Sequence, residues 1–514
     1  MYLQATEKRN SMESIVGAAL RGRPFRVNNL STILIAMTRA ATECRPYSYL
    51  LILIAFLGLA GVSAKASVRN QVKIAISTTG LIRVDAELPT PARSWSFRNA
   101  YAGALGLAER VEEFQAFTES GKDARAKKSA TGEFRSEIDA SRILYMVRLS
   151  NPRASDLPHA SWLVDGRGFL MFADTLPVDT ASVSAEFVVP SGWAVESSIT
   201  PDRDGRYEVL APEKAVFFLG RPPGKASKSV GGMMLETVVD GSWRFNEDDA
   251  LKAATEVMER YLALTGFKLP GKSTIMIATS PVALGNSIWK AETRGSSVVV
   301  VMDPAARSKN SLGQVRVIFT HELLHLWVPN SLKLEGDYDW FFEGFTLYMA
   351  LRMALELKVI NFEGFLTTLS GVYDVYTAHP DKLSLIEESE RRWTSAASQV
   401  YVKGMLVAFL YDLLVRKDSG GKTTLAAIYR DLFNGGVTDN ANGNEAIIRL
   451  LGSSPASKDF VKSYVENSKE VELEQLLPAY GLQLDSSGKT SQLRVSRELN
   501  EDQRQLLRSL GYRN

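Results

Sequence analysis

Cysteine and histidine are scarce in this sequence. Of its 514 residues, one is a cysteine, Cys44, and four are histidines: His159, His321, His325 and His379. A single cysteine cannot form a disulfide within the chain, so the fold must be stabilised by packing and, locally, by any metal ion that it binds. With so few histidines, chance rarely places two of them four residues apart.

Charge of either sign is not in excess. Lys and Arg together number 60, Asp and Glu together number 58, and the composition is 45% hydrophobic and 23% charged. Balanced charge gives no reason to expect a polyanionic partner, so we expect no binding to nucleic acid. The composition is typical of a globular protein, and the length is enough for two or three domains with an ample core.

The apolar run near the N-terminus, residues 49–60, is too short to predict a membrane span. It follows Arg45 and precedes Ala64-Lys65-Ala66, a pattern that predicts a signal peptide with Ser67 as the first residue of the mature protein. Met37 is an alternative start for this signal. We therefore expect an exported protein, periplasmic or secreted. A membrane anchor formed by residues 49–62 is the alternative, and the membrane is a partner only in that case.

The main chemical signal is His-Glu-Leu-Leu-His, formed by His321, Glu322 and His325. If residues 315–327 are helical, the two histidines lie one turn apart on one face, where both can bind a single zinc ion, with Glu322 beside them. Two histidines on a polar helix surface are the alternative, but the neighbouring residues are mostly apolar, and buried imidazoles need partners. Zinc also needs a third protein ligand, which Glu343 supplies if a second helix crosses near the first.

This motif, with Trp327 two residues after it, resembles the gluzincin zinc metallopeptidases, and most closely their glycyl-aminopeptidase branch. The resemblance extends to the segment Trp340-Phe341-Phe342-Glu343-Gly344-Phe345-Thr346. It implies a thermolysin-like catalytic domain in which His321, His325 and Glu343 hold zinc. Seventeen residues lie between His325 and Glu343. This is slightly fewer than in the family, and it affects loop-borne specificity more than metal binding.

Two further residues gain a role through this resemblance. Tyr401, in Tyr401-Val402-Lys403-Gly404, matches the Tyr-x-Lys-Gly element of gluzincin aminopeptidases, whose tyrosine hydroxyl stabilises the tetrahedral intermediate. Packing within an apolar helix is the alternative for this side chain. Glu292 is in register with a glutamate that binds the free amine of the substrate, although the neighbouring glycine and histidine of that family segment are missing. An exposed loop glutamate is the alternative.

The expected fold class is α+β with several domains. Alternating apolar residues predict strands from about residue 72 to 222, a helix is predicted over 246–264, and buried strands over 274–278 and 297–302. Residues 298–302 are expected either at the sheet edge, where a peptide could add as a strand, or in the core.

The expected segments are a signal peptide with an upstream extension (1–66), an N-terminal β-rich domain (67–231) ending in a linker (221–232), a thermolysin-like catalytic domain (232–360), a helical region completing the site (361–485) and a C-terminal tail (486–514).

Together these features predict a zinc-dependent peptide hydrolase, aminopeptidase-like, that acts on a peptide or protein substrate. Glu322 would act as general base on zinc-activated water, and Tyr401 and the zinc ion would share the charge of the oxyanion. Two alternatives remain open at this point. One is a zinc hydrolase of non-peptide substrates, and the other is an inactive peptide-binding scaffold.

Overall fold

A computed structural model describes residues 70–513 except 150–151, 286–287, 307–310, 380–381 and 393–398. The described chain forms two compact units that divide between Pro223 and Gly224. The expected signal segment and the predicted mature start, Ser67, lie outside the described residues. Among the described helices, none combines the length and apolar character that crossing a membrane requires.

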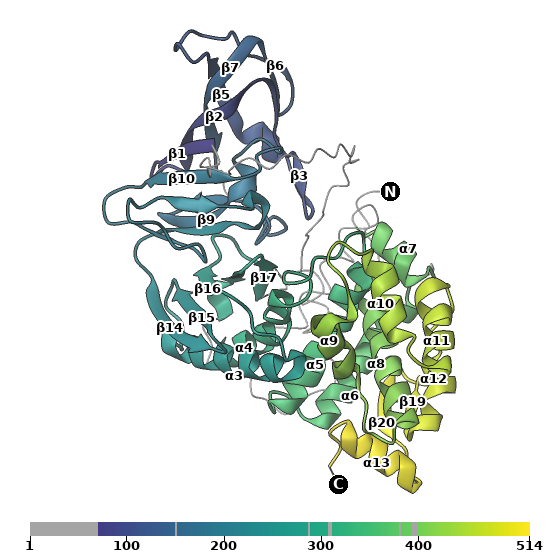
Figure 1. Cartoon of the computed structure of the whole chain (residues 1–514). Helices are drawn as coiled ribbons and strands as arrows, with labels where there is room; N and C mark the ends of the chain where they lie inside the picture. The colour runs from purple at the N-terminus through teal and green to yellow at the C-terminus, as the bar shows by residue number, and fades with distance from the viewer. Residues whose placement is uncertain are drawn as a thin grey trace, which may run out of the picture. The chain divides into compact units, whose positions relative to one another are not determined.

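The unit of residues 70–223 is built from β-strands, as the alternating pattern predicts (Figure 1). Its larger sheet has the order β12-β10-β1-β2-β7-β5, with β6 also paired to β7, and its smaller sheet has the order β11-β13-β9-β8. The larger sheet contains β1 (Asn70–Ile76), β2 (Leu81–Ser96), β5 (Val111–Phe117), β6 (Lys127–Ala130), β7 (Glu133–Arg148), β10 (Val183–Val188) and β12 (Tyr207–Val209). The smaller contains β8 (Trp162–Val164), β9 (Arg167–Met171), β11 (Ala194–Glu196) and β13 (Val216–Gly220).

Both sheets of this unit contribute to one hydrophobic core. Alternate residues of β1 and of the first part of β2 are buried, for example Ile74, Ile82 and Val84, because successive strand residues point to opposite faces. From the smaller sheet, Leu170 and Phe217 enter the same core. A core filled from two sheet faces is the arrangement of a β-sandwich.

The unit of residues 224–513 begins with a five-stranded mixed sheet of order β14-β15-β16-β18-β17. Its strands are β14 (Gly224–Val230), β15 (Met233–Val239), β16 (Lys272–Thr279), β17 (Trp289–Arg294) and β18 (Ser297–Met302). The three inner strands are parallel to one another, and the two outer strands are antiparallel to their neighbours. Helices α3 (Glu247–Thr265) and α4 (Ser311–Glu322) contribute side chains to the same core as one face of this sheet.

Two expectations about this sheet need correction. The segment expected to be a linker contains β14, an edge strand whose mostly exposed polar side chains resemble a loop in composition. The domain boundary therefore lies near residue 223 rather than 231. The edge strand on the other side is β17, whereas β18 is paired on both sides. Residues 298–302 are thus a core strand, the alternative that the apolar run also allowed.

Helices make up most of the remaining chain (Figure 1). They are the π-helix η7 (Trp340–Phe345) and α5 (Thr346–Glu356), α6 (Phe362–Thr377), α7 (Leu385–Glu390), α8 (Val400–Asp418), α9 (Leu425–Asp431), α10 (Gly443–Leu451), α11 (Pro455–Val461), α12 (Leu473–Leu476) and α13 (Glu501–Ser509). A small hairpin, β19 (Leu482–Asp485) and β20 (Gln492–Val495), precedes α13. These helices share one hydrophobic core with the five-stranded sheet, so residues 232–360 and 361–485 do not form separate cores.

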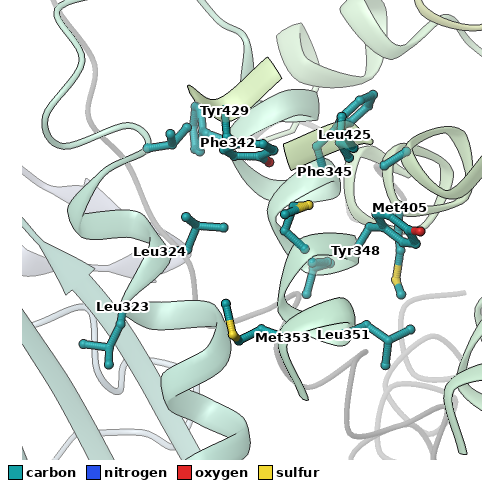
Figure 2. Packing of buried hydrophobic residues seen from close by; sticks show 14 of the residues in the cluster. Leu323, Leu324, Phe342, Phe345, Tyr348, Leu351, Met353, Met405, Leu425 and Tyr429 are labelled. Carbon is teal, nitrogen blue, oxygen red and sulfur yellow. The ribbon is translucent and has the colours of Figure 1, made fainter. Parts of the chain in front are cut away.

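Figure 2 shows part of this core from close by. Leu324, just after α4, and Met405, on α8, lie on opposite sides of the helix that carries Phe345 and Tyr348. The expected C-terminal tail also joins the core, because Leu506 and Leu507 of α13 and Leu510 just after it are buried in the core. The sequence signal for α13 is its capping box, in which Asn500 and Gln503 bond to each other's backbone N–H groups.

Candidate metal centre

The two histidines of the motif lie at the end of α4, where the helix tightens. The α-helix ends at Glu322, and His325 lies in a 3₁₀ turn, Leu324–Leu326, rather than in a helix continuous to residue 327. Pro329 follows closely, and a proline cannot continue a helical hydrogen-bond ladder. The backbone stays right-handed through Leu323. The two Nε2 atoms of His321 and His325 consequently still meet, 3.0 Å apart.

Glu343 comes from a π-helix that lies beside this turn. Residues Trp340–Phe345 form η7. The π-helix is rare in proteins, and where it occurs it is often part of a functional site. Glu343 Oε2 lies 3.8 Å from His321 Nε2 and 3.7 Å from His325 Nε2. The crossing of a second helix near the motif, expected from the sequence, therefore brings three potential ligand atoms within 4.8 Å of one another.

Burial controls the protonation of these three side chains. His321, His325 and Glu343 are all buried. Loss of solvent lowers the pKa of His321 well below its usual range and that of His325 to about 4, so both imidazoles are neutral near neutral pH. Burial also raises the pKa of Glu343 to about 8, an effect that the charge of Arg392 opposes. Neutral imidazoles are the form that binds a metal.

The donor atoms fit a zinc ion. Oε2 of Glu343 is buried and has no hydrogen-bond partner among the described residues. His325 Nδ1 lies 2.9 Å from the carbonyl oxygen of Val328 and must donate to it, which leaves the lone pair of Nε2 directed toward the cluster. Two imidazole nitrogens and one carboxylate oxygen are the protein ligands of many catalytic zinc sites. The residues present are thus suited to zinc.

The net charge of the buried side chains around this site also favours a divalent cation. Three carboxylates lie in this region of the core: Glu322, Asp339 and Glu343. Arg392 forms ion pairs with the last two of them. One guanidinium leaves two negative charges unbalanced when the carboxylates are ionised, and buried unbalanced charge is costly. A divalent cation would balance the cluster.

Glu322 is held by the edge strand of the sheet. The Thr293 hydroxyl lies 2.8 Å from Glu322 Oε2 and 2.8 Å from the Glu322 backbone oxygen. Burial raises the pKa of Glu322 well above its usual range, and the contact with Thr293 opposes the shift. Glu322 Oε1 has no hydrogen-bond partner among the described residues. Glu322 is therefore a fixed carboxylate with one oxygen toward Thr293 and one that can accept a proton.

Two glycines account for the closeness of Tyr401 to the cluster. Gly344 of η7 packs on Gly404 of α8, where a Cβ on Gly344 would lie 2.6 Å from the Gly404 Cα atom. The two backbones can approach this closely only because neither residue has a side chain. Tyr401 lies three residues before Gly404 on the same helix face, and its half-buried side chain receives a hydrogen bond from Arg392. Burial raises the pKa of Tyr401 well above its usual range, so its hydroxyl keeps its proton.

Glu292 has a partner that the sequence did not suggest. Its Oε1 accepts hydrogen bonds from Arg294 Nη2 at 2.9 Å and Nε at 3.0 Å, and both side chains are 1% exposed. Neighbouring residues of a strand point to opposite faces, so Glu292 and Thr293 lie on opposite sides of β17. The alternative interpretation of Glu292 as an exposed loop residue is therefore wrong, because the residue lies in a buried edge strand.

Three residues of this centre escaped sequence analysis: Thr293, Asp339 and Arg392. Thr293 neighbours Glu292 in the sequence, but its contact with Glu322, 29 residues away, has no local sequence signal. Asp339 directly precedes the aromatic segment around Glu343, and that position was a usable signal. Arg392 lies 49 residues after Glu343, and no local spacing rule relates the two.

Comparison with known proteins identifies the fold. No family model matches the sequence, and no curated protein matches it. The structure is similar to that of an aminopeptidase N family protein from Idiomarina loihiensis, with a TM-score of 0.69 and 17% identity, over 81% of this chain and 79% of that one. The chain has the M1 aminopeptidase fold.

A second similar structure, with a TM-score of 0.51 and 13% identity, is that of an M1 zinc metallopeptidase variant from Deinococcus radiodurans bound to a Tyr-Ser-Ala substrate. The similarity covers 79% of this chain and 95% of that one. The expected mixture of a β-rich N-terminal part and a helical C-terminal part is confirmed. The thermolysin-like and glycyl-aminopeptidase assignments stay predictions.

Proposed function

We propose that this protein is a zinc-dependent peptide hydrolase. The observation that carries the proposal is the meeting of one oxygen and two nitrogens, from Glu343, His321 and His325, beside a buried carboxylate, Glu322. The fold supports the same conclusion, because a zinc metallopeptidase of that fold has been solved with a tripeptide substrate.

Zinc held by His321, His325 and Glu343 would supply Lewis-acid activation of water and of the substrate carbonyl. Glu322 takes the proton of the attacking water and delivers it to the leaving amine, since its position beside the histidines places it within reach of both. The protonated hydroxyl of Tyr401 donates a hydrogen bond to the oxyanion that forms on the carbonyl. The products are the two halves of a cleaved peptide bond.

The edge strand β17 suits binding of an extended peptide. Among the described strands it is paired with β18 alone, and Thr293 in it contacts the proposed general base Glu322. A peptide that adds to its outer side gains main-chain hydrogen bonds and runs past Glu322. This arrangement favours peptides over the non-peptide amides or epoxides of the alternative hydrolase.

A purified full-length chain tests the function directly. Chelation should abolish cleavage of a mixed peptide library, and zinc should restore it. Glu322→Gln should keep zinc but lose at least about a thousandfold in kcat, because the general base is gone. Equal cleavage by Glu322→Gln and wild type would reject the mechanism. A wild type that binds zinc and peptides without cleaving them would instead support the peptide-binding scaffold.

The ion pair of Glu292 bears on the choice between aminopeptidase and endopeptidase. Because Arg294 already neutralises Glu292, a substrate ammonium gains little from this carboxylate. We therefore expect Glu292→Gln to affect free and N-acetylated peptides by the same factor. A loss of one to two orders of magnitude in kcat/KM on free peptides alone, about what one charge-assisted bond contributes, would restore the amine-binding role.

Export is proposed on the sequence alone, from the apolar run of residues 49–60 and the Ala64-Lys65-Ala66 signal. N-terminal sequencing of the protein recovered from cells should begin near Ser67. A cytosolic species that retains residues 37–66 would contradict this assignment, and a membrane-bound one would indicate the anchor.

A further inference from the structure

One arginine contacts three functional groups of the metal centre at once. The side chain of Arg392 is 2% exposed. Its Nη1 donates to Asp339 Oδ1, one residue before η7, and its Nη2 donates to both Glu343 Oε1 and the Tyr401 hydroxyl. The Arg392–Glu343 distance is 2.9 Å. A single guanidinium thus joins the proposed third zinc ligand to the proposed oxyanion donor.

The contact with Glu343 selects which carboxylate oxygen faces the histidines. Arg392 binds Oε1, and Oε2 is the atom that lies 3.7 and 3.8 Å from the two Nε2 atoms. With one oxygen fixed by a charged donor, the carboxylate cannot rotate without losing that bond. Asp339 fixes the guanidinium from the opposite side, because its carboxylate binds the other terminal nitrogen.

The contact with Tyr401 selects the direction of the tyrosine hydrogen. Arginine has only donors, so the Tyr401 oxygen must be the acceptor in this bond. The hydrogen of the hydroxyl is not used in this contact, and a bond accepted from a cation makes a hydroxyl a stronger donor. The guanidinium therefore orients Tyr401 as a donor, which is the role that an oxyanion requires.

We propose that Arg392 is a positioning residue that couples zinc binding by Glu343 to transition-state stabilisation by Tyr401. The Tyr401 part rests on the proposed function, whereas the Glu343 part concerns metal affinity alone. The planar fork of arginine suits three acceptors in fixed directions, and a lysine ammonium on a flexible stem does not. Charge alone is thus not sufficient at this position.

The first test measures zinc affinity of the full-length apo-protein by competition with a chelator. Arg392→Met should weaken zinc binding by about 10- to 100-fold, the usual effect of removing a partner of a metal ligand. Arg392→Lys should fall between Arg392→Met and wild type, and it serves as the variant of choice if Arg392→Met does not fold. Tyr401→Phe should leave zinc affinity unchanged.

Arg416→Met is the matched control for buried charge. Arg416 lies on the same helix as Tyr401, about 22 Å further along, is also buried, and pairs with Asp412 at 2.9 Å. Its loss should lower the unfolding temperature as a buried ion pair does, with zinc affinity within about twofold of wild type. A zinc affinity reduced equally in Arg416→Met and Arg392→Met would show that both act through general destabilisation, which would overturn the proposal.

The second test is a double-mutant cycle on kcat at saturating zinc. If Arg392 acts through the tyrosine, Arg392→Met should reduce kcat about as much as Tyr401→Phe, and the double variant should lose little more than either. If the fold-loss in kcat of the double variant equals the product of the two single losses, the two residues act independently, and the coupling to Tyr401 is overturned. An unchanged zinc affinity in Arg392→Met and Arg392→Lys would overturn the coupling to Glu343.

These outcomes are distinct from failure of the proposed function. If the wild type binds no zinc, both proposals fall at the first measurement. If the wild type binds zinc and cleaves peptides while the Arg392 variants match it, only the positioning role is lost.

Discussion

Both units of the chain have exposed charged pairs, such as Lys333 with Asp439 in the second, but the second unit also buries several. In residues 70–223, most ion pairs lie on exposed strand surfaces, such as Arg142 with Asp85, whose side chains are 48% and 23% exposed. Among the described residues of 224–513, the buried pairs include Arg294 with Glu292, Arg416 with Asp412, and Arg392 with both Asp339 and Glu343. Exposed pairs contribute little to stability, whereas breaking a buried pair costs several kcal/mol.

The cores of the two units also differ in how many charged groups they contain. The β-unit is filled by apolar and aromatic side chains, including a cluster of Phe97, Phe114, Phe134 and Tyr145 in which the rings of Phe114 and Phe134 stack at 4.2 Å. The metal centre of the second unit places three carboxylates, two imidazoles and a guanidinium inside its core. Stability alone does not favour such burial, so it indicates a site where fixed polar groups are needed. Substitutions in the two units should therefore have very different consequences.

Among substitutions that compare the two units, we expect Tyr401→Phe to have the largest effect. Tyr401→Phe removes one donor to the oxyanion and should lower kcat by one to three orders of magnitude, with zinc content unchanged. Tyr411→Phe is the matched control, because its hydroxyl also forms a buried hydrogen bond, to the Leu451 carbonyl at 2.8 Å, on the same helix. Steady-state kinetics on one peptide would compare the two. A kcat for Tyr401→Phe equal to that of Tyr411→Phe would reduce Tyr401 to a packing residue.

A smaller effect, on stability and geometry together, is expected at the glycine contact. In Gly404→Ala the new methyl group would lie 2.9 Å from the Gly344 Cα atom and 3.0 Å from the Trp340 carbonyl oxygen. Overpacking of this kind costs about 1–3 kcal/mol of unfolding free energy, and it should also shift Tyr401 and lower kcat. Denaturant unfolding with kinetics checks both.

Gly488→Ala provides the control, since Gly488 is exposed and its added methyl group would meet only the Thr490 carbonyl oxygen, at 3.6 Å. Its unfolding free energy should change by less than about 0.5 kcal/mol. Equal stability and activity of Gly404→Ala and Gly488→Ala would contradict the close contact between Gly404 and Gly344.

The smallest effect is expected at the exposed pair of the β-unit. Arg142→Ala removes two hydrogen bonds to Asp85, at 2.5 and 2.7 Å, on an exposed strand surface. Exposed pairs of this kind contribute less than about 1 kcal/mol, and salt weakens them. Thermal unfolding at low and high salt should show a small loss that disappears at high salt. A loss as large as that of Arg416→Met would contradict the distinction between the two units.

Sequence reasoning succeeded where the pattern is local. The alternation of Ile74, Ile82 and Val84 predicted strands, and the four-residue spacing of His321 and His325 placed two imidazoles together, because neither depends on distant parts of the chain. Only the resemblance to a known family connected Glu343 with this motif, since 17 residues separate it from His325 and no local spacing rule spans them. The sequence motifs contain Gly344 and Gly404, but the motifs alone do not predict that these two glycines form a contact between two helices.

The misses share a different cause, which is dependence on tertiary context. An edge strand such as β14 carries polar side chains on its exposed side and therefore reads as a loop. An exposed loop was one interpretation of Glu292, and only the structure shows its pairing with Arg294 on one face of a buried strand. Arg392 lies just after α7 and far along the chain from Glu343, and no local pattern predicts their contact.

The metal content of the purified chain tests the central claim most directly. Elemental analysis should find one zinc ion per wild-type chain and almost none in His321→Ala or His325→Ala, because each variant removes one of three converging ligand atoms. A β-unit variant such as Arg142→Ala should retain the full amount. Stoichiometric zinc in both histidine variants would contradict the site, and with it the mechanism built on it.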